Sequence, residues 1–274
     1  TSLAYPYSSA KSFILSNQVC LSSEILKCFS IYDIKIFSEA YDKMRYENRG
    51  KNANDLVEIP NFRKLIPDLN NKKVLDLGCG YGENDIYCRK LGAKAVLGID
   101  ISEHMLKIAM NNNKDKGISY KLMAMEDIGK LEEKFDVVIS SLAIHYVKNY
   151  DKLIKDIYDL LNEDGILIFS IDHPLRIANK FEPWMEKNYT EINGKWFLLV
   201  SDYNREGIRE KEWNGVMVKK YHRNFSSLIN GLVNSGFKID EILEPIPDEE
   251  AIKIIPKYIN QYDRPYFLFI RAKK

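Results

Sequence analysis

Four short apolar runs between residues 73 and 171 alternate with stretches of helical spacing. The runs are KVLDL, AVLGID, FDVVIS and GILIFSI, and the intervening stretches include NDIYCRKLG, SEHMLKIAMNNN and YDKLIKDIYDLL. Strands that are apolar along nearly their whole length are buried on both faces, and strands that alternate with helices are typical of parallel sheets. A weaker strand, SYKLMAM, is expected between the second and third runs. The pattern therefore predicts an α/β fold with a mostly parallel sheet.

The same alternation divides the chain into segments. We expect an N-terminal helical segment (residues 1–70), an α/β core (71–171), an inserted cap (172–222) and a C-terminal helix with two strands that complete the sheet (223–274). The N-terminal segment has apolar residues at helical spacing, with a break expected at Pro60. The inserted cap is rich in aromatic residues, and its turn at Asn193 and Gly194 predicts a hairpin. The last two strands are expected to pair as an antiparallel hairpin at the sheet edge.

The composition limits the kinds of molecule with which the chain is expected to interact. The chain has 274 residues, of which 45% are apolar and 29% charged, as in ordinary globular proteins. Lys and Arg number 40 and Asp and Glu 39, so no nucleic-acid partner is expected. No apolar run is long enough to span a membrane. The four cysteines have no CxxC spacing, which favours reduced thiols and a cytoplasmic location. We expect a monomer or a homodimer.

A glycine turn follows the first apolar run, and an acid ends the second. Gly78, Gly80 and Gly82 come directly after VLDL, and Asp100 closes VLGID. In parallel sheets, ligands bind at the carboxyl ends of the strands, where glycines let a ligand approach the backbone. The helix that follows offers unpaired N–H groups, and a carboxylate at the end of the second strand can accept both hydroxyls of a ribose. These features predict a nucleoside ligand.

Two acidic residues indicate which nucleoside it is. The dinucleotide fingerprint G-x-G-x-x-G requires a glycine or alanine at the position of Glu83, which disfavours an NAD-dependent oxidoreductase. Asp76 precedes the turn, where an acid is a poor neighbour for a pyrophosphate and a good one for an ammonium group. This favours S-adenosylmethionine (SAM), a nucleoside that carries a cationic amino acid.

At these residues the chain resembles the class I SAM-dependent methyltransferases. VLDLGCGYG is similar to their first motif, VLGIDIS to the second, FDVVISSLAIHYV to the fourth-strand segment and LLNEDGILIFS to the fifth. More narrowly, the N-terminal MRYENRG segment, SIDHP and KKYHRNFSS resemble a bacterial subgroup of small-molecule methyltransferases, compared with those of quinone biosynthesis. The resemblance implies a Rossmann-like sheet with an antiparallel edge strand, N-terminal helices over the cofactor site, and SAM as the cofactor.

The resemblance also implies roles for individual residues. By position it assigns the SAM ammonium group to Asp76 and the ribose to Asp100. It assigns backbone contacts with SAM to Gly78, Cys79 and Gly80, and contacts with the adenine to Ile101, Met105, Met125 and Glu126. The methionine portion of SAM is assigned to Ser140, Ser141 and Tyr41. Met105 is equally compatible with a plain core position. Glu126 is chosen because the usual aspartate position of the family falls on Ala124. Arg45 is an alternative to Tyr41.

Three histidines are candidates for catalysis. His145 follows the fourth strand, His173 the fifth, and His222 precedes the helix after the inserted cap. Methyl transfer mainly requires alignment of donor and acceptor, and a general base contributes roughly 10²–10⁴-fold only when the acceptor loses a proton. Each histidine is as compatible with a structural hydrogen bond as with a base, and we rank His145 first. Their spacing does not indicate a metal site.

The aromatic residues of the inserted cap favour a small, partly apolar or aromatic methyl acceptor. Two alternatives remain open at this stage. A nucleic-acid or protein methyltransferase is disfavoured by the neutral charge balance and by SSLAIHYV, which lacks the prolines typical of amino-methylating DNA enzymes. A protein that binds SAM without transferring its methyl group is not distinguishable by sequence.

Overall fold

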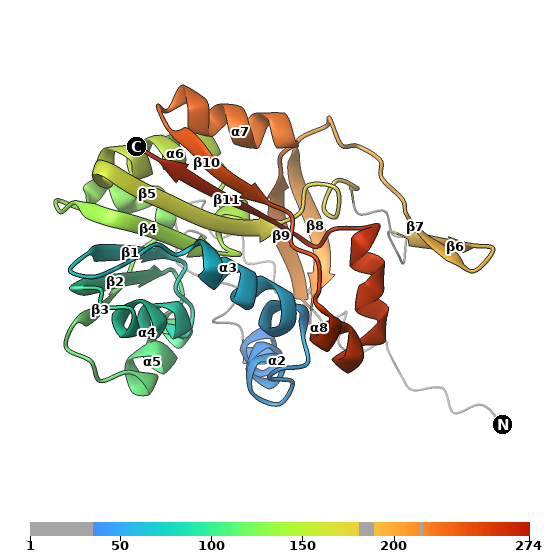
Figure 1. Ribbon diagram of the computed structural model, residues 1–274, viewed down its shortest axis with the longest axis horizontal. Helices are drawn as coiled ribbons and strands as arrows, with labels where there is room; N and C mark the ends of the chain where they lie inside the picture. The colour runs from blue at the N-terminus through green and yellow to red at the C-terminus, as the bar shows by residue number, and fades with distance from the viewer. Residues whose placement is uncertain (1–34, 181–188, 214–215) are drawn as a thin grey trace, which may run out of the picture.

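A seven-stranded sheet lies at the centre of the molecule (Figure 1). The computed structural model describes residues 35–180, 189–213 and 216–274. The strands of the sheet are β1 (Lys73–Leu77), β2 (Ala95–Asp100), β3 (Ile118–Leu122), β4 (Phe135–Ser141), β5 (Leu161–Asp172), β10 (Lys238–Leu243) and β11 (Phe267–Lys273). Their order is β10-β11-β5-β4-β1-β2-β3, and β11 alone runs in the direction opposite to the other strands. The predicted parallel sheet with an antiparallel hairpin at its edge is confirmed.

Helices cover both faces of this sheet (Figure 1), with α6 and α7 on one face and α3 and α4 on the other. The helical elements are α2 (Lys35–Tyr46), η3 (Asn54–Glu58), α3 (Ile59–Leu65), α4 (Glu83–Lys90), α5 (Glu103–Asn112), η4 (Met125–Lys130), η5 (Ile144–Tyr146), α6 (Tyr150–Leu160), α7 (Phe225–Asn234), α8 (Glu249–Ile254) and η6 (Pro256–Tyr262). Within the described ranges, every helix is too short or too polar to cross a membrane.

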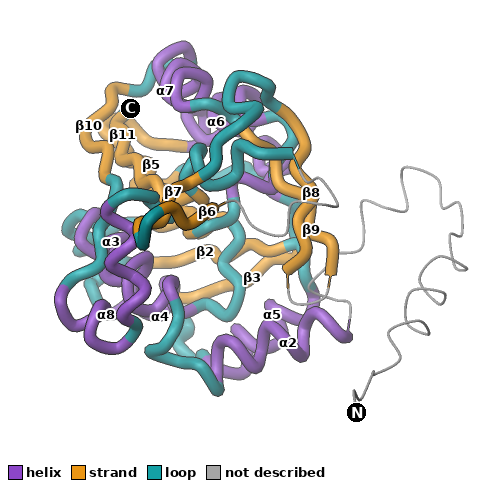
Figure 2. Tube along the Cα trace, turned by 90° about the vertical axis from the view of Figure 1, so that its right-hand side faces the viewer, coloured by secondary structure: helices purple, strands orange, loops and turns teal. Residues whose placement is uncertain are grey.

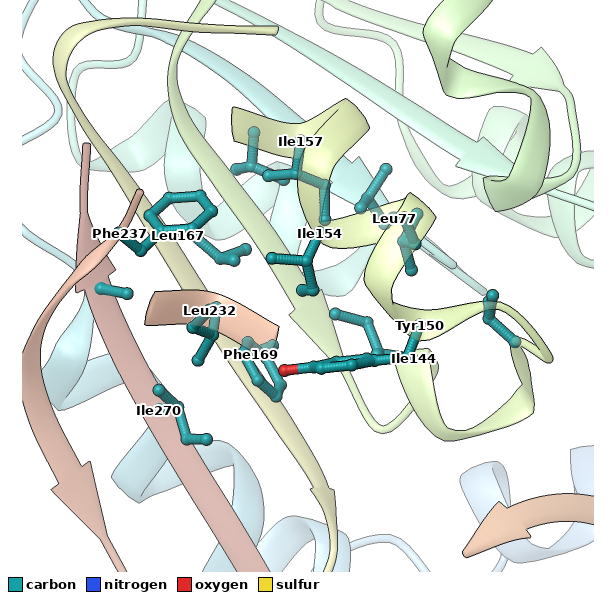
Figure 3. Packing of buried hydrophobic residues seen from close by; sticks show 14 of the residues in the cluster. Leu77, Ile144, Tyr150, Ile154, Ile157, Leu167, Phe169, Leu232, Phe237 and Ile270 are labelled. Carbon is teal, nitrogen blue, oxygen red and sulfur yellow. The ribbon is translucent and has the colours of Figure 1, made fainter. Parts of the chain in front are cut away.

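The core forms two apolar layers because successive residues of a strand point to opposite faces of the sheet. In β5, Leu167 and Phe169 point into the layer beneath α6 and α7, where they lie near Ile154 (Figure 3). Ile168, between them, points into the other layer with Phe62 of α3. This alternation anchors the strands, and so the positions of their carboxyl ends are fixed.

The strand order reverses between β1 and β4, which is where ligands bind in sheets of this kind. β1 continues into the glycine turn (residues 78–82), and β4 into a sharp bend at Leu142, whose φ is +53°. These two turns touch each other. Gly78 has a φ of +75°, and a Cβ added to it would lie 2.5 Å from the Cβ of Ala143. A ligand in this crevice therefore meets both turns.

The segment before β1 is helical, but it does not break at Pro60. The π-helix η3 passes directly into α3, with Pro60 in the first turn of α3. Proline has no N–H to donate, so the helical hydrogen-bond ladder lacks one bond at this position, yet the helix continues. The N–H of Ile59 bonds to the carbonyl of Asn54, five residues earlier, so the backbone widens just before the proline. The expected break is therefore wrong, and the widened turn ends at Glu58.

The inserted cap contains two small hairpins outside the main sheet. They pair β6 (Tyr189–Ile192) with β7 (Lys195–Leu198), and β8 (Gly207–Trp213) with β9 (Val216–His222). The hairpin predicted at Asn193 and Gly194 is confirmed, and both turn residues have positive φ, as its two-residue turn requires. Trp184 of the cap lies outside the described residues. An ion pair between Lys220 of β9 and Asp172 ties the second hairpin to the end of β5.

Candidate active site

The glycine turn between β1 and α4 presents its backbone to the crevice. The N–H groups of Gly78 and Cys79 donate to the carbonyl oxygen of Ile99 at 2.9 and 3.0 Å, which fixes the turn on β2. At Gly80 φ is +54°, and an added Cβ would meet no atom within 4 Å. The Cys79 thiol is buried and lies against Gly98 of β2 instead. A ligand in the crevice would therefore contact backbone rather than side chains here.

Asp100 ends β2 with a carboxylate that two backbone groups hold in place. Its Oδ2 accepts a hydrogen bond from the Gly80 N–H at 3.0 Å, and its Oδ1 accepts one from the Ser102 N–H at 2.9 Å. The side chain is half-buried, and the adjacent Ile101 is 40% exposed. A carboxylate has about four acceptor sites, so Asp100 can also accept hydrogen bonds from ligand hydroxyls.

A pair of buried carboxyl groups lies behind the glycine turn. Asp76 of β1 is 1% exposed, and Asp85 of α4 is completely buried. Burial and the neighbouring Asp85 raise the pKa of Asp76 well above its usual value, and burial raises the pKa of Asp85 to about 7. Neither oxygen of Asp85 has a hydrogen-bond partner among the described residues. Adjacent buried acids resist ionisation of both members, so this part of the site is complementary to a cation.

A further buried acid, Glu58, lies at the carboxyl ends of β4 and β5. Its Oε1 accepts hydrogen bonds from Ser141 Oγ at 2.8 Å and from Ser170 Oγ at 2.5 Å, and the residue is 1% exposed. Burial raises the pKa of Glu58 to about 7, although the two serines, Arg45 and Arg63 act in the opposite direction. Neither Glu58 nor Asp85 was predicted as a site residue from the sequence.

Helix α2 lies beside α5 (Figure 2) and packs on the glycine turn. The ring of Tyr41 meets the ring of Tyr81 edge to face, with the centroids 5.6 Å apart. The Tyr81 hydroxyl donates to Asp42, and Arg45 forms an ion pair with Glu83 at the start of α4. The N-terminal segment thus reaches the crevice through Tyr41 and Arg45, the two residues that the resemblance places near the cofactor.

His145, the first-ranked candidate base, is 3% exposed in η5. Its Nδ1 accepts a hydrogen bond from the Asp172 N–H at 3.3 Å, and its Nε2 has no partner among the described residues. Burial, together with the charge of Lys220, lowers the pKa of His145 to about 3, so the imidazole is neutral near pH 7 with its proton on Nε2. A cavity of about 10 Å³ lies beside it, which is space for one water molecule.

The other two histidines also have hydrogen-bond partners of their own. His173 Nε2 lies 2.7 Å from Glu244 Oε1, and His222 Nε2 donates to the carbonyl oxygen of Tyr203 at 2.8 Å. Burial lowers the pKa of both histidines, although Glu244 and the Tyr203 carbonyl act in the opposite direction. Among the described residues, no hydrogen bond joins any two of the three histidines. Their catalytic roles stay predictions.

The remaining residues assigned by resemblance differ in exposure. Met105 is 2% exposed, and the Ser140 hydroxyl donates to the backbone of β1 at 2.8 Å, so both occupy interior positions. Met125 is half-buried, with its Cε 3.8 Å from the place of an added Gly78 Cβ. Glu126 is exposed at the start of η4. Where the structure describes the chain, no group of three or more His, Cys, Asp or Glu side chains could hold a metal ion.

Comparisons with known proteins agree with this arrangement. Residues 75–169 match the family model of the methyltransferase domain. An uncharacterized protein of Haemophilus influenzae is 34% identical over 255 residues, which cover 89% of this chain and 97% of that protein. A crystal structure of an S-adenosylmethionine-dependent methyltransferase from Mesorhizobium loti has 30% identity and a TM-score of 0.71, over 82% of this chain and 99% of the other.

A relative with a named acceptor matches over a shorter range. The malonyl-[acyl-carrier protein] O-methyltransferase of Bacillus cereus is 30% identical over 133 residues, which are 48% of each chain. The shared part thus spans about half of that relative. The similarity to 99% of the Mesorhizobium protein, the strand order and the glycine turn together support one assignment. The chain belongs to the S-adenosylmethionine-dependent methyltransferases, with SAM as its cofactor and a Rossmann-like sheet as its core.

Proposed function

We propose that this methyltransferase modifies a small, partly apolar or aromatic acceptor rather than a polymer. The supporting observation is the surroundings of Tyr146 at the mouth of the site. The Nζ of Lys220, from the inserted cap, lies 5.5 Å from the centroid of the Tyr146 ring. Desolvation raises the pKa of Tyr41 in α2 to about 12, and nearby Tyr146 adds to the rise. Elements from the N-terminal segment and the cap thus approach the same residue over the carboxyl ends of the strands.

The residues around the glycine turn fit SAM. The open space at Gly80 admits a ligand against the backbone, and the oriented carboxylate of Asp100 suits the two ribose hydroxyls. The exposed side chain of Ile101 suits an adenine face, and the acid pair of Asp76 and Asp85 suits the positive charge of the ligand. SAM supplies a methyl group on a positively charged sulfur. The task of the chain is to align the acceptor with that methyl group and exclude water.

Replacing Asp100 with alanine should weaken SAM binding by roughly 1.5–3 kcal/mol, or about 10–150-fold, because it removes hydrogen bonds to a charged group. Calorimetric titration with SAM measures the change, and circular dichroism verifies folding. Asp159→Ala is the matched control, since Asp159 is 57% exposed on α6 and away from the glycine turn. Equal SAM affinity for wild type and a folded Asp100→Ala protein would refute the ribose assignment.

The acceptor class is tested with methyl-labelled SAM. We expect the wild-type protein to transfer label to a compound in a small-molecule extract of bacterial cells, and to transfer little to separate protein and RNA fractions. The Asp100→Ala protein, which binds SAM weakly, serves as the background control. Label that appears mainly in protein or RNA would favour the polymer alternatives. Binding of SAM without transfer to any fraction would favour a SAM-binding protein without transfer activity.

A further inference from the structure

Glu58 is an acid built into the end of the sheet by residues distant in sequence. Ser141 is the last residue of β4, and its partner across the parallel ladder is Ser170 of β5. Both hydroxyls donate to the same oxygen, Oε1 of Glu58. The Leu142 N–H in turn donates to Ser170 Oγ at 3.0 Å, so the serine is itself held in place. The carboxyl group therefore has a fixed orientation.

This acid lies next to the cofactor crevice. Ser141, which bonds to Glu58, is followed by the left-handed Leu142 and then by Ala143. The Cβ of Ala143 fills the place where a side chain on Gly78 would lie. The bend after β4 therefore connects Glu58 directly to the glycine turn. Consistent with this position, the charge of Glu58 contributes to the raised pKa of Asp76, after burial, Asp85 and Asp100.

One oxygen of Glu58 is left for a ligand. Among the described residues, hydrogen bonds reach only Oε1, so Oε2 has no hydrogen-bond partner there. The π-helix η3 ends at Glu58, and wide turns of this kind are frequent at functional sites. By contrast, His145 already accepts a hydrogen bond at Nδ1 and carries its proton on Nε2. Its imidazole has no lone pair left to take another proton.

We propose that Glu58 accepts the proton of the methyl acceptor, whose reacting atom is a nitrogen or oxygen that carries hydrogen. This inference rests on the proposed function. The lone pair of the acceptor atom forms the new bond to the methyl carbon, and the electron pair of the broken carbon–sulfur bond stays on sulfur. The proton passes to Oε2, which converts the carboxylate to the neutral acid, and then to solvent.

The surroundings of Glu58 suit a base that works near neutral pH. Burial raises its pKa to about 7, and the charges of Arg45 on α2 and Arg63 on α3 oppose a larger rise. Asp76 on β1 is the nearby acid, and the charge of Glu58 contributes to the raised pKa of that residue. A base is most effective when its pKa lies near the working pH. The rate of transfer should therefore increase as the pH rises through about 7, because only the carboxylate form accepts a proton.

The test compares wild type with Glu58→Gln, using methyl-labelled SAM and the small-molecule extract. We expect turnover to fall by roughly 10²–10⁴-fold, while SAM affinity changes by less than about threefold. The pH dependence near 7 should disappear, and Glu58→Asp should restore part of the rate. Glu163→Gln is the matched control, because Glu163 is exposed before the apolar part of β5. Should Glu58→Gln fail to fold, Glu58→Asp and Ser170→Ala give the same comparison of rate against SAM affinity.

Several outcomes would overturn the proposal. Unchanged turnover and an unchanged pH profile in Glu58→Gln would make the residue structural only, and so would equal losses of SAM affinity and turnover. Mass spectrometry of the labelled product identifies the methylated atom, and a thioether or tertiary amine acceptor would contradict the role because neither loses a proton. If wild type transfers no label while SAM still binds, the proposed function fails and the Glu58 role fails with it.

Discussion

Replacing Gly78 with alanine should lower the free energy of unfolding by about 2–5 kcal/mol. A non-glycine residue in the left-handed region costs roughly 1–2 kcal/mol, and Gly78 has a φ of +75°. The new Cβ would also lie 2.5 Å from the Cβ of Ala143, and forced overpacking of this kind costs roughly 1–3 kcal/mol. Because the two turns that touch here line the crevice, SAM affinity should fall as well.

Substitutions at Gly50 and Gly80 separate the backbone contribution from the steric contribution to the loss of stability expected for Gly78→Ala. Gly50 has a φ of +72° and no atom within 4 Å of an added Cβ, so Gly50→Ala measures the cost of the left-handed backbone alone. Gly80 also has a positive φ and no atom within 4 Å of an added Cβ, but it faces the crevice. Gly80→Ala should therefore be about as stable as Gly50→Ala and yet bind SAM more weakly. Urea denaturation and SAM titration of the three variants provide the data. A Gly78→Ala protein as stable as Gly50→Ala would contradict the steric argument.

Replacing Asp85 with asparagine should stabilise the protein without ligand by about 2–4 kcal/mol at pH 8 and change it little at pH 4. Burial raises the pKa of Asp85 from 3.8 to about 7, and a tenfold change in proton affinity corresponds to roughly 1.4 kcal/mol. An acid with a raised pKa binds its proton more tightly in the folded chain. Its contribution to stability is therefore complete below pH 3.8 and is lost as the pH rises through about 7. Asparagine has no charge to bury.

Thermal melts of wild type and Asp85→Asn between pH 4 and pH 8 test this linkage. The difference in stability should grow with pH, and Asp159→Asn, at a residue 57% exposed on α6, serves as the control for the loss of a carboxyl group elsewhere. If Asp85→Asn gives no gain in stability at pH 8, or the same gain at every pH, then ionisation of the Asp85 carboxyl does not destabilise the folded protein. The pair of Asp76 and Asp85 also has a consequence for function, because a cationic ligand beside Asp76 would relieve the repulsion between the two carboxylates.

Local pattern was sufficient to predict the sheet and the cofactor turn. The apolar runs reflect burial on both faces, and the positions of Gly80 and Asp100 follow from where the strands end. Asp85 was missed because an acid in the first turn of a helix is favoured near the helix dipole whether or not it is buried. Its depth depends on the packing of α4 against β2 and β3, which no local pattern reveals.

Glu58 was missed for a different reason. Its partners, Ser141 and Ser170, lie 83 and 112 residues away, and the resemblance assigned Ser141 to SAM rather than to an acid. A break was expected at Pro60, two residues after Glu58, whereas the helix continues through it. The histidines show the opposite case. Strand order placed His145 correctly at the end of β4, but its buried hydrogen bond is not readable from a sequence.

The long connection between Glu58 and the sheet also sets an order for folding. Each strand–helix–strand unit of the core joins neighbours in sequence, and such short-range contacts form early because little chain entropy is lost. The bond from Glu58 to Ser170 closes a loop of 112 residues and forms only after β4 and β5 are paired. We therefore expect the glycine turn to form before Glu58 reaches its two serines.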